Sequence, residues 1–564
     1  ELDGGRAVQL QLGQVIEAPG TFRVTLLRGI DAPPATPLDV TARFQVNGAL
    51  ADGTLTADDL VPGRNALYLS LDADGDGRPE NQTSSVFRWD PLLAAACSRV
   101  ITPVVGVNHS DPIYMAGFGN DRQATGVHDD LWARGWVVQN ADKKIAVVTL
   151  DVIGYFNNEI RTLRELPTVS GLGFDAIMVT STHVHEGPDT MGLWGPDQTT
   201  SGADTGYLDF VNQSVADCVA EANANLAPAE IRFATGSTVG TSLPPNPDLV
   251  ADGHVLQPYV IPGNLFDPPR PGDVVVQGDP GEITNPSVPA LQIRNRVTHQ
   301  ILATVVNFAS HPESLGSDNT FLTADFPHFM RDALEAAYGG LAIYVSADLG
   351  VLQGPLDVDI TDPATGQPAA RRTFRFAEVM GQKLAERAKL ALDGVSTWDP
   401  DPALDVRSSG RIQVRVENPF FLAASAFGVF GRRQLERDAD RHIVTSTEAN
   451  VLRIGPAQMA LTPNELDPQI GYAYKDQMEN ADHKWVMGLA NDEIGYQMPA
   501  EKFNPSCHAC AAFVILGNDA DCPIAQELGV DVVDCSTVFM NNIGPMTDTQ
   551  LQGVFGGLIG ELNP

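Results

Sequence analysis

The stretch AIMVTSTHVH, residues 176–185, begins as an apolar, β-branched run and ends in two histidines. A run of the same form, KIAVVTLD at 144–151, precedes it, and a helical pattern, YLDFVNQSVADCVAEANANL at 207–226, follows it. Strand-like runs that alternate with helical patterns are typical of an α/β fold. We therefore expect this region to form part of an α/β domain.

The alternation continues through most of the chain after residue 92. Further strand-like runs are LATVVNFASHP (302–312), LAIYVSADLG (341–350), QMALTPNE (458–465) and KWVMGLANDEIGY (484–496). Further helical patterns, with apolar residues recurring at three and four, are HFMRDALEAAYGG (328–340) and RTFRFAEVMGQKLAERAKLALDG (372–394). We assign residues 93–564 to one α/β domain and expect a long irregular loop at 240–290, where Pro, Gly and Asp are frequent.

The first 92 residues have a different pattern. Short runs such as DVTARFQV (39–46) and NALYLSL (65–71) alternate apolar and polar residues between turns. This predicts a small immunoglobulin-like β-sandwich. Within it, Asp72, Asp74 and Asp76 resemble the first half of a calcium loop, but Thr83 stands where a bidentate acid belongs. A calcium site and a solvated acidic turn remain equal alternatives.

Composition excludes some partners. The 564 residues include 36 basic and 71 acidic ones, giving a net charge of −35, which repels nucleic acid and anionic membrane surfaces at long range. The longest nearly apolar run, at 419–431, is too short to span a membrane, so no transmembrane helix is expected. The acidic excess favours a secreted, periplasmic or other extracellular protein. The oligomeric state does not follow from the sequence.

Four of the six cysteines, Cys507, Cys510, Cys522 and Cys535, lie within 29 residues, whereas Cys97 and Cys218 are far apart. A zinc knot would use the Cys-x-x-Cys pair, but a second close pair is missing. We predict disulfides and expect the Cys-rich segment 505–540 to form a disulfide-bonded cap near the candidate active site described below. The alternative is a C-terminal staple far from it.

Polar residues that can bind a metal or transfer protons follow the ends of the predicted strands. They are Asp151, His183, His185, His311, Asp348, Glu465 and Tyr496. In α/β sheets ligands bind outside the carboxyl ends of the strands, so these endings predict one shared site, although a single histidine there would more often be structural.

Histidines 183 and 185 are two residues apart, so both side chains leave the same face if the strand persists. His311, Glu465 and water would complete a site of nitrogen and oxygen ligands that suits Zn²⁺ with an open position. Such a site predicts hydrolysis of an amide or ester by metal-activated water.

Five segments in order along residues 98–505 resemble the neutral/alkaline (non-lysosomal) ceramidase family of zinc amidases. They are YMAGFGNDRQATGVHDDLWARGWVV (114–138), STHVHEGP (181–188), VVNFASHPESL (305–315), MALTPNEL (459–466) and GLANDEIGYQMPAEKF (488–503). The resemblance implies the family's mixed-sheet α/β catalytic domain.

The same resemblance implies roles for single residues. His183, His311, Glu465 and Tyr496 would hold the zinc, and His185 becomes a nearby residue that handles protons or binds the oxyanion. His128 and Arg134 match the segment that lines the substrate entrance in the family. An exposed ion pair at a helix start is their alternative role.

Two departures concern the substrate. The chain has DLGVLQGP (348–355) where the family has Asn-Leu-Gly-Asp-Val-Ser-Pro-Asn, so Gln353 or Gly354 replaces the serine, and Glu186 replaces the serine of the His-Ser-Gly-Pro motif. We predict a zinc-dependent amidohydrolase acting on an N-acyl lipid such as ceramide, with Tyr496 also supporting the oxyanion. An esterase or lactonase with a non-sphingoid substrate and a non-catalytic binding module remain alternatives.

Overall fold

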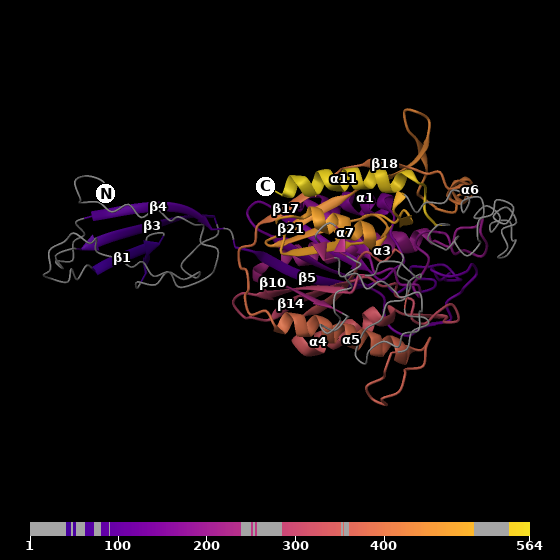
Figure 1. Ribbon diagram of the computed structural model, residues 1–564, viewed down its shortest axis with the longest axis horizontal. Coiled ribbons are helices and arrows are strands. Elements are labelled where there is room, and N and C mark those ends of the chain that lie inside the picture. The colour runs from indigo at the N-terminus through magenta and orange to yellow at the C-terminus, as the bar shows by residue number, and fades with distance from the viewer. Residues whose placement is uncertain are drawn as a thin grey trace.

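The structure is a computed structural model (Figure 1). It describes residues 41–46, 49–51, 63–72, 81–89, 91–237, 250–251, 254–255, 285–350, 354, 360–500 and 541–563. For the strands before residue 90 only the backbone pairing is described.

An eight-stranded sheet forms the centre of the α/β domain. Its spatial order is β16 (Leu341–Ser346), β14 (Ile301–Phe308), β13 (Ser287–Asn295), β10 (Ala227–Ser237), β5 (Leu93–Val100), β7 (Trp132–Gln139), β8 (Lys144–Leu150) and β9 (Ala176–Ser181). The outer pairs β14–β16 and β8–β9 are parallel, and the inner strands pair antiparallel. The sheet is mixed, as the family resemblance implied.

A four-stranded sheet packs against one face of the large sheet. Its order is β17 (Leu404–Ser408), β21 (Asn450–Ile454), β22 (Ala457–Leu461) and β24 (His483–Met487), with β22 and β24 parallel. One buried apolar cluster contains side chains from both sheets, including Val147, Val305 and Trp485. The period of two along each strand sends the alternate residues to the outer faces, where Val148 and Val306 pack on helices.

Helices cover both outer faces, so the domain has four layers. The outer face of the large sheet carries α1 (Asn157–Glu165), α2 (Pro167–Ser170) and α3 (Thr205–Ala224) at one end and α4 (Asp325–Tyr338) and α5 (Phe374–Asp393) at the other. The small sheet is covered by α6 (Pro419–Phe427), α7 (Pro468–Gln477) and α11 (Met546–Leu562). Figure 1 shows α4 and α5 on the opposite side of the stacked sheets from α11.

The remaining strands are short. They are β6 (Gly126–Val127) with β15 (Phe321–Leu322), β11 (Val250–Ala251) with β12 (His254–Val255), β18 (Ile412–Arg415) with β20 (Ile443–Thr447) and β19 (Glu436–Arg437), and β23 (Glu465–Leu466) with β25 (Tyr496–Gln497). The part of the chain that the structure describes contains no helix long and apolar enough to cross a membrane.

The N-terminal region contains one antiparallel sheet among its described residues. Its order is β2 (Ala49–Ala51), β1 (Thr41–Val46), β3 (Gly63–Asp72) and β4 (Asn81–Trp89). The antiparallel strands agree with the expected all-β character. The second layer of a sandwich is not among the described residues, so the immunoglobulin-like assignment for 1–92 stays a prediction.

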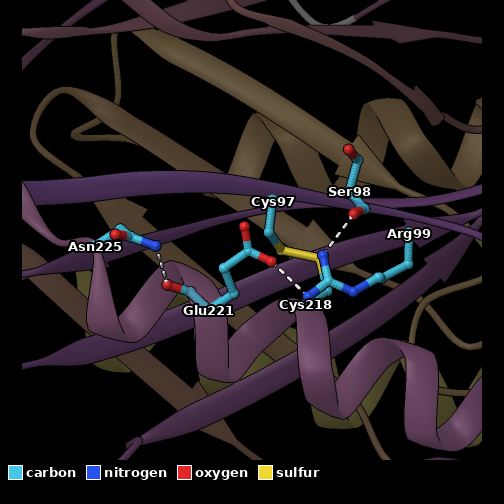
Figure 2. The surroundings of a disulfide bond; sticks show 6 residues. All are labelled: Cys97, Ser98, Arg99, Cys218, Glu221 and Asn225. Carbon is cyan, nitrogen blue, oxygen red and sulfur yellow. Dashed lines mark hydrogen bonds and ion pairs between the residues drawn. A yellow bond between two sulfur atoms is a disulfide. The ribbon is translucent and has the colours of Figure 1, made fainter.

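A disulfide joins Cys97 on β5 to Cys218 on α3 across 121 residues of sequence (Figure 2). Beside it, Arg99 of the same strand forms an ion pair with Glu221 of the same helix. The bridge therefore links the central strand of the large sheet to the helix that covers it. The sequence favoured bonding within the cluster Cys507–Cys535, but that cluster lies outside the described residues and its pairing stays a prediction.

Candidate functional site

A cavity of about 560 Å³ lies where the chain leaves the carboxyl ends of β9, β14 and β22. Its polar lining contains His183, His185, His311, Glu313, Arg433, Glu465, Glu493 and Tyr496. Its apolar lining includes Phe118, Ile153, Phe156, Met191, Leu193, Trp194, Val416, Phe420, Phe421, Val429, Phe430, Leu435, Ile494 and Ile543. The arrangement combines a cluster of histidines and carboxylates with an apolar chamber.

His183 enters the cavity from a turn and not from a strand. β9 ends at Ser181, and His183 has φ +63°, in the left-handed region that costs a non-glycine residue about 1–3 kcal/mol. Its backbone N–H donates to Val152 O at 3.1 Å, and its ring Nδ1 lies 2.6 Å from Ile153 O. These bonds hold the turn and leave Nε2 directed at the cavity, so the assumption that the strand continues through both histidines was wrong.

His311, Glu465 and Tyr496 meet His183 at one point. The Glu465 Oε2 lies 3.2 Å from His183 Nε2 and 2.9 Å from His311 Nε2. The Tyr496 hydroxyl lies 3.5 Å from the same His311 nitrogen. Glu465 and Tyr496 are register partners in the two-residue parallel pair β23–β25, which fixes their side chains side by side.

His185 completes the cluster and rests on the segment 116–122. Its ring lies 5.1 Å from that of His183 and 5.1 Å from Phe118, both edge to face. Gly117, at φ +97°, would bring an added Cβ within 2.3 Å of the imidazole, so only glycine lets the backbone support this ring. The Arg122 guanidinium donates to the carbonyls of Ala116 and His185, which ties the segment to the turn.

The donor atoms fit a zinc ion. Zn–N and Zn–O bonds of about 2.0–2.2 Å at tetrahedral angles place neighbouring ligand atoms about 3.3 Å apart, close to the measured separations of 2.9, 3.2 and 3.5 Å. The bond from His183 Nδ1 to a carbonyl is the outer contact that orients a ligating imidazole. His183, His185 and His311 are an alternative ligand set, because one ring nitrogen from each of them lies within 4.8 Å of the other two.

Burial and the neighbouring charged groups together shift the pKa values of these residues. Burial lowers the pKa of His185 well below 6.5, helped by the neighbouring His183 and His311, so the His185 imidazole is neutral. Burial raises the pKa of Tyr496 well above 10, and Glu465 adds to the rise. Burial would also raise the pKa of Glu465, but His183 and His311 outweigh it and lower that pKa to about 2.

Sequence reasoning missed three charged residues of the lining. Glu313 follows His311 by two residues, and Glu493 precedes Tyr496 by three. Arg433 arrives from the segment after α6 and binds the buried Asp492 with both terminal nitrogens. The proximity of the two glutamates to predicted ligands was the only signal available, and Arg433 offered none.

Some predicted residues lie elsewhere in the described structure. His128 stacks on Phe374 at 3.7 Å, and Arg134 forms an ion pair with Glu335; neither lines the cavity. Asp151 is paired with the Arg331 guanidinium at 2.9 Å. The structure does not bring these three residues to the cluster.

The remaining predicted residues have different positions. Asp348 accepts from Lys475 at 3.0 Å and does not line the cavity. Gly354 donates its N–H to Glu313, whereas Gln353 lies outside the described residues. Asp74, Asp76 and segment 505–540 also lie outside them, and of Asp72 only its position at the end of β3 is described. The calcium loop and the cysteine-bonded cap stay predictions.

Comparison with known proteins agrees with the sequence resemblance. A family profile described as neutral/alkaline non-lysosomal ceramidase, N-terminal, matches residues 105–244. The neutral ceramidase of Mycobacterium tuberculosis (strain ATCC 25618 / H37Rv) is 23% identical over 297 residues, which are 50% of this chain and 43% of that protein.

Two solved ceramidase structures have a fold similar to that of this chain. The crystal structure of neutral ceramidase from Pseudomonas aeruginosa superposes with a TM-score of 0.58 at 16% identity, covering 84% of this chain and 75% of the other. A ceramidase complexed with C2 gives a TM-score of 0.57 at 14% identity, with coverage of 84% and 76%. The predicted mixed α/β fold is therefore confirmed.

Proposed function

We propose, from the premise that the chain is a divergent member of the neutral/alkaline ceramidase family, that it is a zinc-dependent hydrolase of an N-acyl lipid amide. The observation that carries this proposal is the convergence of His183 and His311 on one oxygen of Glu465 in the lining of a cavity that also has many apolar side chains. Two imidazole nitrogens and a carboxylate oxygen that converge on one point are the kinds of ligand that hold Zn²⁺ in proteins.

The residues of this chain have separate tasks in such a reaction. His183, His311, Glu465 and Tyr496 would hold the metal, which supplies Lewis acidity that makes water a nucleophile near neutral pH. His185 is neutral and stands beside the ligands without a hydrogen-bond partner on either ring nitrogen in the described structure. It can therefore accept a proton during attack and return it to the leaving amine.

The cavity supports an acyl substrate. Side chains of Phe156, Phe421 and Phe430 face the same chamber as the histidines, and burying an alkyl chain there contributes about 0.8 kcal/mol per methylene. An ester or lactone is the second candidate. It is supported by the departure at Gly354, whose N–H is bonded to Glu313 in the segment where the family carries its serine block.

Metal content and turnover test the proposal together. We expect about one equivalent of zinc in chelator-free protein, and we expect His183→Ala to lose both metal and activity on N-acylsphingosine. His185→Ala is the matched variant: it should keep the metal and lose about 10²-fold or more in kcat. Metal loss in both variants would favour the three-histidine set, and full activity without metal would overturn the proposal.

We also propose that the protein is secreted or periplasmic. The disulfide Cys97–Cys218 supports this, because such bonds persist in oxidising compartments. Detection of the protein only in the cytosolic fraction of its native cell, with both thiols reduced, would contradict it.

A further inference from the structure

The Glu313 carboxylate lies beside the ring of His185. Its Oε2 is 3.4 Å from His185 Nδ1, and both residues line the cavity and are buried. The backbone brings them together, because the His185 N–H donates to Pro312 O at 3.1 Å. Since Glu313 directly follows Pro312, its side chain starts next to the imidazole.

The other oxygen of Glu313 is anchored by the backbone of Gly354. Glu313 Oε1 accepts from Gly354 N at 2.6 Å. A Cβ at position 354 would lie 2.3 Å from Glu313 Cγ and 2.9 Å from His311 O, so any side chain there would displace the carboxylate. Only glycine at this position leaves room for Glu313 where the structure places it.

This contact explains a departure of the sequence from the ceramidase family. Gly354 lies in DLGVLQGP (348–355), which stands where the family has its serine block, and Glu313 is the variable residue of the motif His-Pro-x-Ser. A glutamate at the second position needs a glycine at the first, because a larger residue would clash with it. The two residues are therefore parts of one arrangement, which the proposed metal ligands do not require.

We propose that Glu313 is a positioning residue for His185, in which its carboxylate accepts from Nδ1–H and leaves Nε2 as the nitrogen that takes up the proton. This inference rests on the proposed function, because it concerns the proton-handling residue of that reaction. A neutral imidazole carries its proton on one nitrogen only, and a carboxylate beside Nδ1 selects the Nδ1–H form. The contact of 3.4 Å is longer than a hydrogen bond, and such contacts of catalytic residues often tighten when substrate binds.

Glu313→Gln tests this role at nearly constant shape. When the amide oxygen of the variant accepts from Gly354 N, its NH₂ group faces Nδ1 and favours the Nε2–H form of His185. We expect kcat on N-acylsphingosine to fall about 10²-fold or more, with KM within about twofold and zinc content unchanged. Glu479→Gln, at an exposed site outside the cavity, should leave all three quantities unchanged.

Gly354→Ala tests the anchor of the carboxylate. The added Cβ should displace Glu313 and lower kcat per bound zinc to a similar degree. The double variant with Glu313→Gln should lie within about twofold of the lower single variant, because both changes remove the same contact. Additive losses would mean that Glu313 and Gly354 act separately, and unchanged kcat in Glu313→Gln would mean that the carboxylate does not position His185; either result would overturn the inference.

Nuclear magnetic resonance of the His185 ring separates this inference from the proposed hydrolysis. In the zinc-loaded protein with ¹⁵N-labelled histidine, the ring signals that disappear in His185→Gln should show the Nδ1–H form, and Glu313→Gln should convert them to the Nε2–H form. The Nδ1–H form without turnover of any amide would refute the hydrolase and support the role of Glu313. The Nε2–H form in the native protein, one form in both proteins, or loss of zinc from Glu313→Gln would overturn the inference.

Discussion

Asp189 fixes the loop that forms one wall of the cavity. Its buried carboxylate accepts from the backbone N–H groups of Met191 at 2.9 Å, Gly192 at 2.6 Å and Trp194 at 2.8 Å. Met191 and Trp194 line the cavity, so one side chain positions two apolar contacts of the proposed acyl chamber. Burial raises the pKa of Asp189 to about 6, against the opposing effect of the three N–H donors.

The raised pKa of Asp189 predicts a pH-dependent contribution to stability. The native state binds this proton more tightly than the unfolded chain, so the contribution is complete below about pH 4 and is lost as pH rises through about 6. The shift corresponds to about 3 kcal/mol. In urea unfolding, the stability of the native protein relative to Asp189→Asn should therefore fall between pH 4 and pH 7. A constant difference would contradict the prediction.

The covalent link between β5 and α3 acts at the scale of elements. Cys97 and Cys218 are both buried in the cluster that joins the large sheet to its helices. Replacing both by alanine removes the constraint on a long loop of the unfolded chain and should lower the free energy of unfolding by about 2–4 kcal/mol.

The matched measurement is urea unfolding of the native protein and the double alanine variant, each followed by circular dichroism. Turnover below the transition should be preserved, because neither cysteine lines the cavity. Unchanged stability would mean that packing alone joins β5 to α3. Lost turnover in a folded variant would mean that the disulfide is needed for the geometry of the site.

The strands and helices that were predicted are those with a clear hydrophobic period, whereas the inner strands β13, β10, β5 and β7 of the large sheet were not predicted. The runs at 144–151 and 302–312 became β8 and β14, and the pattern at 372–394 became α5. The polar residues after the strands were less informative. Asp151 follows the end of β8 as His311 follows the end of β14, yet Asp151 forms a buried ion pair with Arg331. Sequence periodicity gives the strand and its end, but a partner on a distant helix decides whether that end joins the site.

Long-range contacts explain the other gaps in the sequence-based prediction. The bridge Cys97–Cys218 joins residues 121 positions apart, and no local pattern encodes that pairing. The positive φ of His183 depends on acceptors in the turn after β8. The expectation that His183 and His185 lie on one face of a continuing strand was therefore wrong. The apolar chamber gathers side chains from segments between 118 and 543, which only the folded chain brings together.

At the scale of the whole molecule, two stacked sheets bring the four segments that carry His183, His311, Glu465 and Tyr496 to one cavity. The isolated bridge between Thr180 and Ala490 links the end of β9 to the segment after β24. Asn491 strengthens it, since its side chain accepts from Val179 N at 2.8 Å. The segment that leads to Tyr496 is therefore tied to the strand that leads to His183, and backbone pairing holds together the two halves of the proposed ligand set.

All of these contacts lie in the chain after residue 90. The apolar clusters of the α/β domain begin at Leu92, and the described strands β1 to β4 pair only with one another. Leu92 itself is anchored, because its N–H donates to Pro400 O and its carbonyl accepts from Ala229 N. The first residues of the α/β domain are thus held by hydrogen bonds to other parts of the same domain.

A chain that begins at residue 91 should therefore keep its metal and its turnover, with kcat within about twofold of the longer protein. A chain that begins at residue 101 is the matched control: it lacks β5, a central strand that pairs with β7 and β10, and should not fold. Zinc content, circular dichroism and turnover of the two proteins distinguish the outcomes. If the chain that begins at residue 91 folds and binds zinc but has lost turnover, residues 1–90 act on the site itself. The assignment of catalysis to the α/β domain alone would then be wrong.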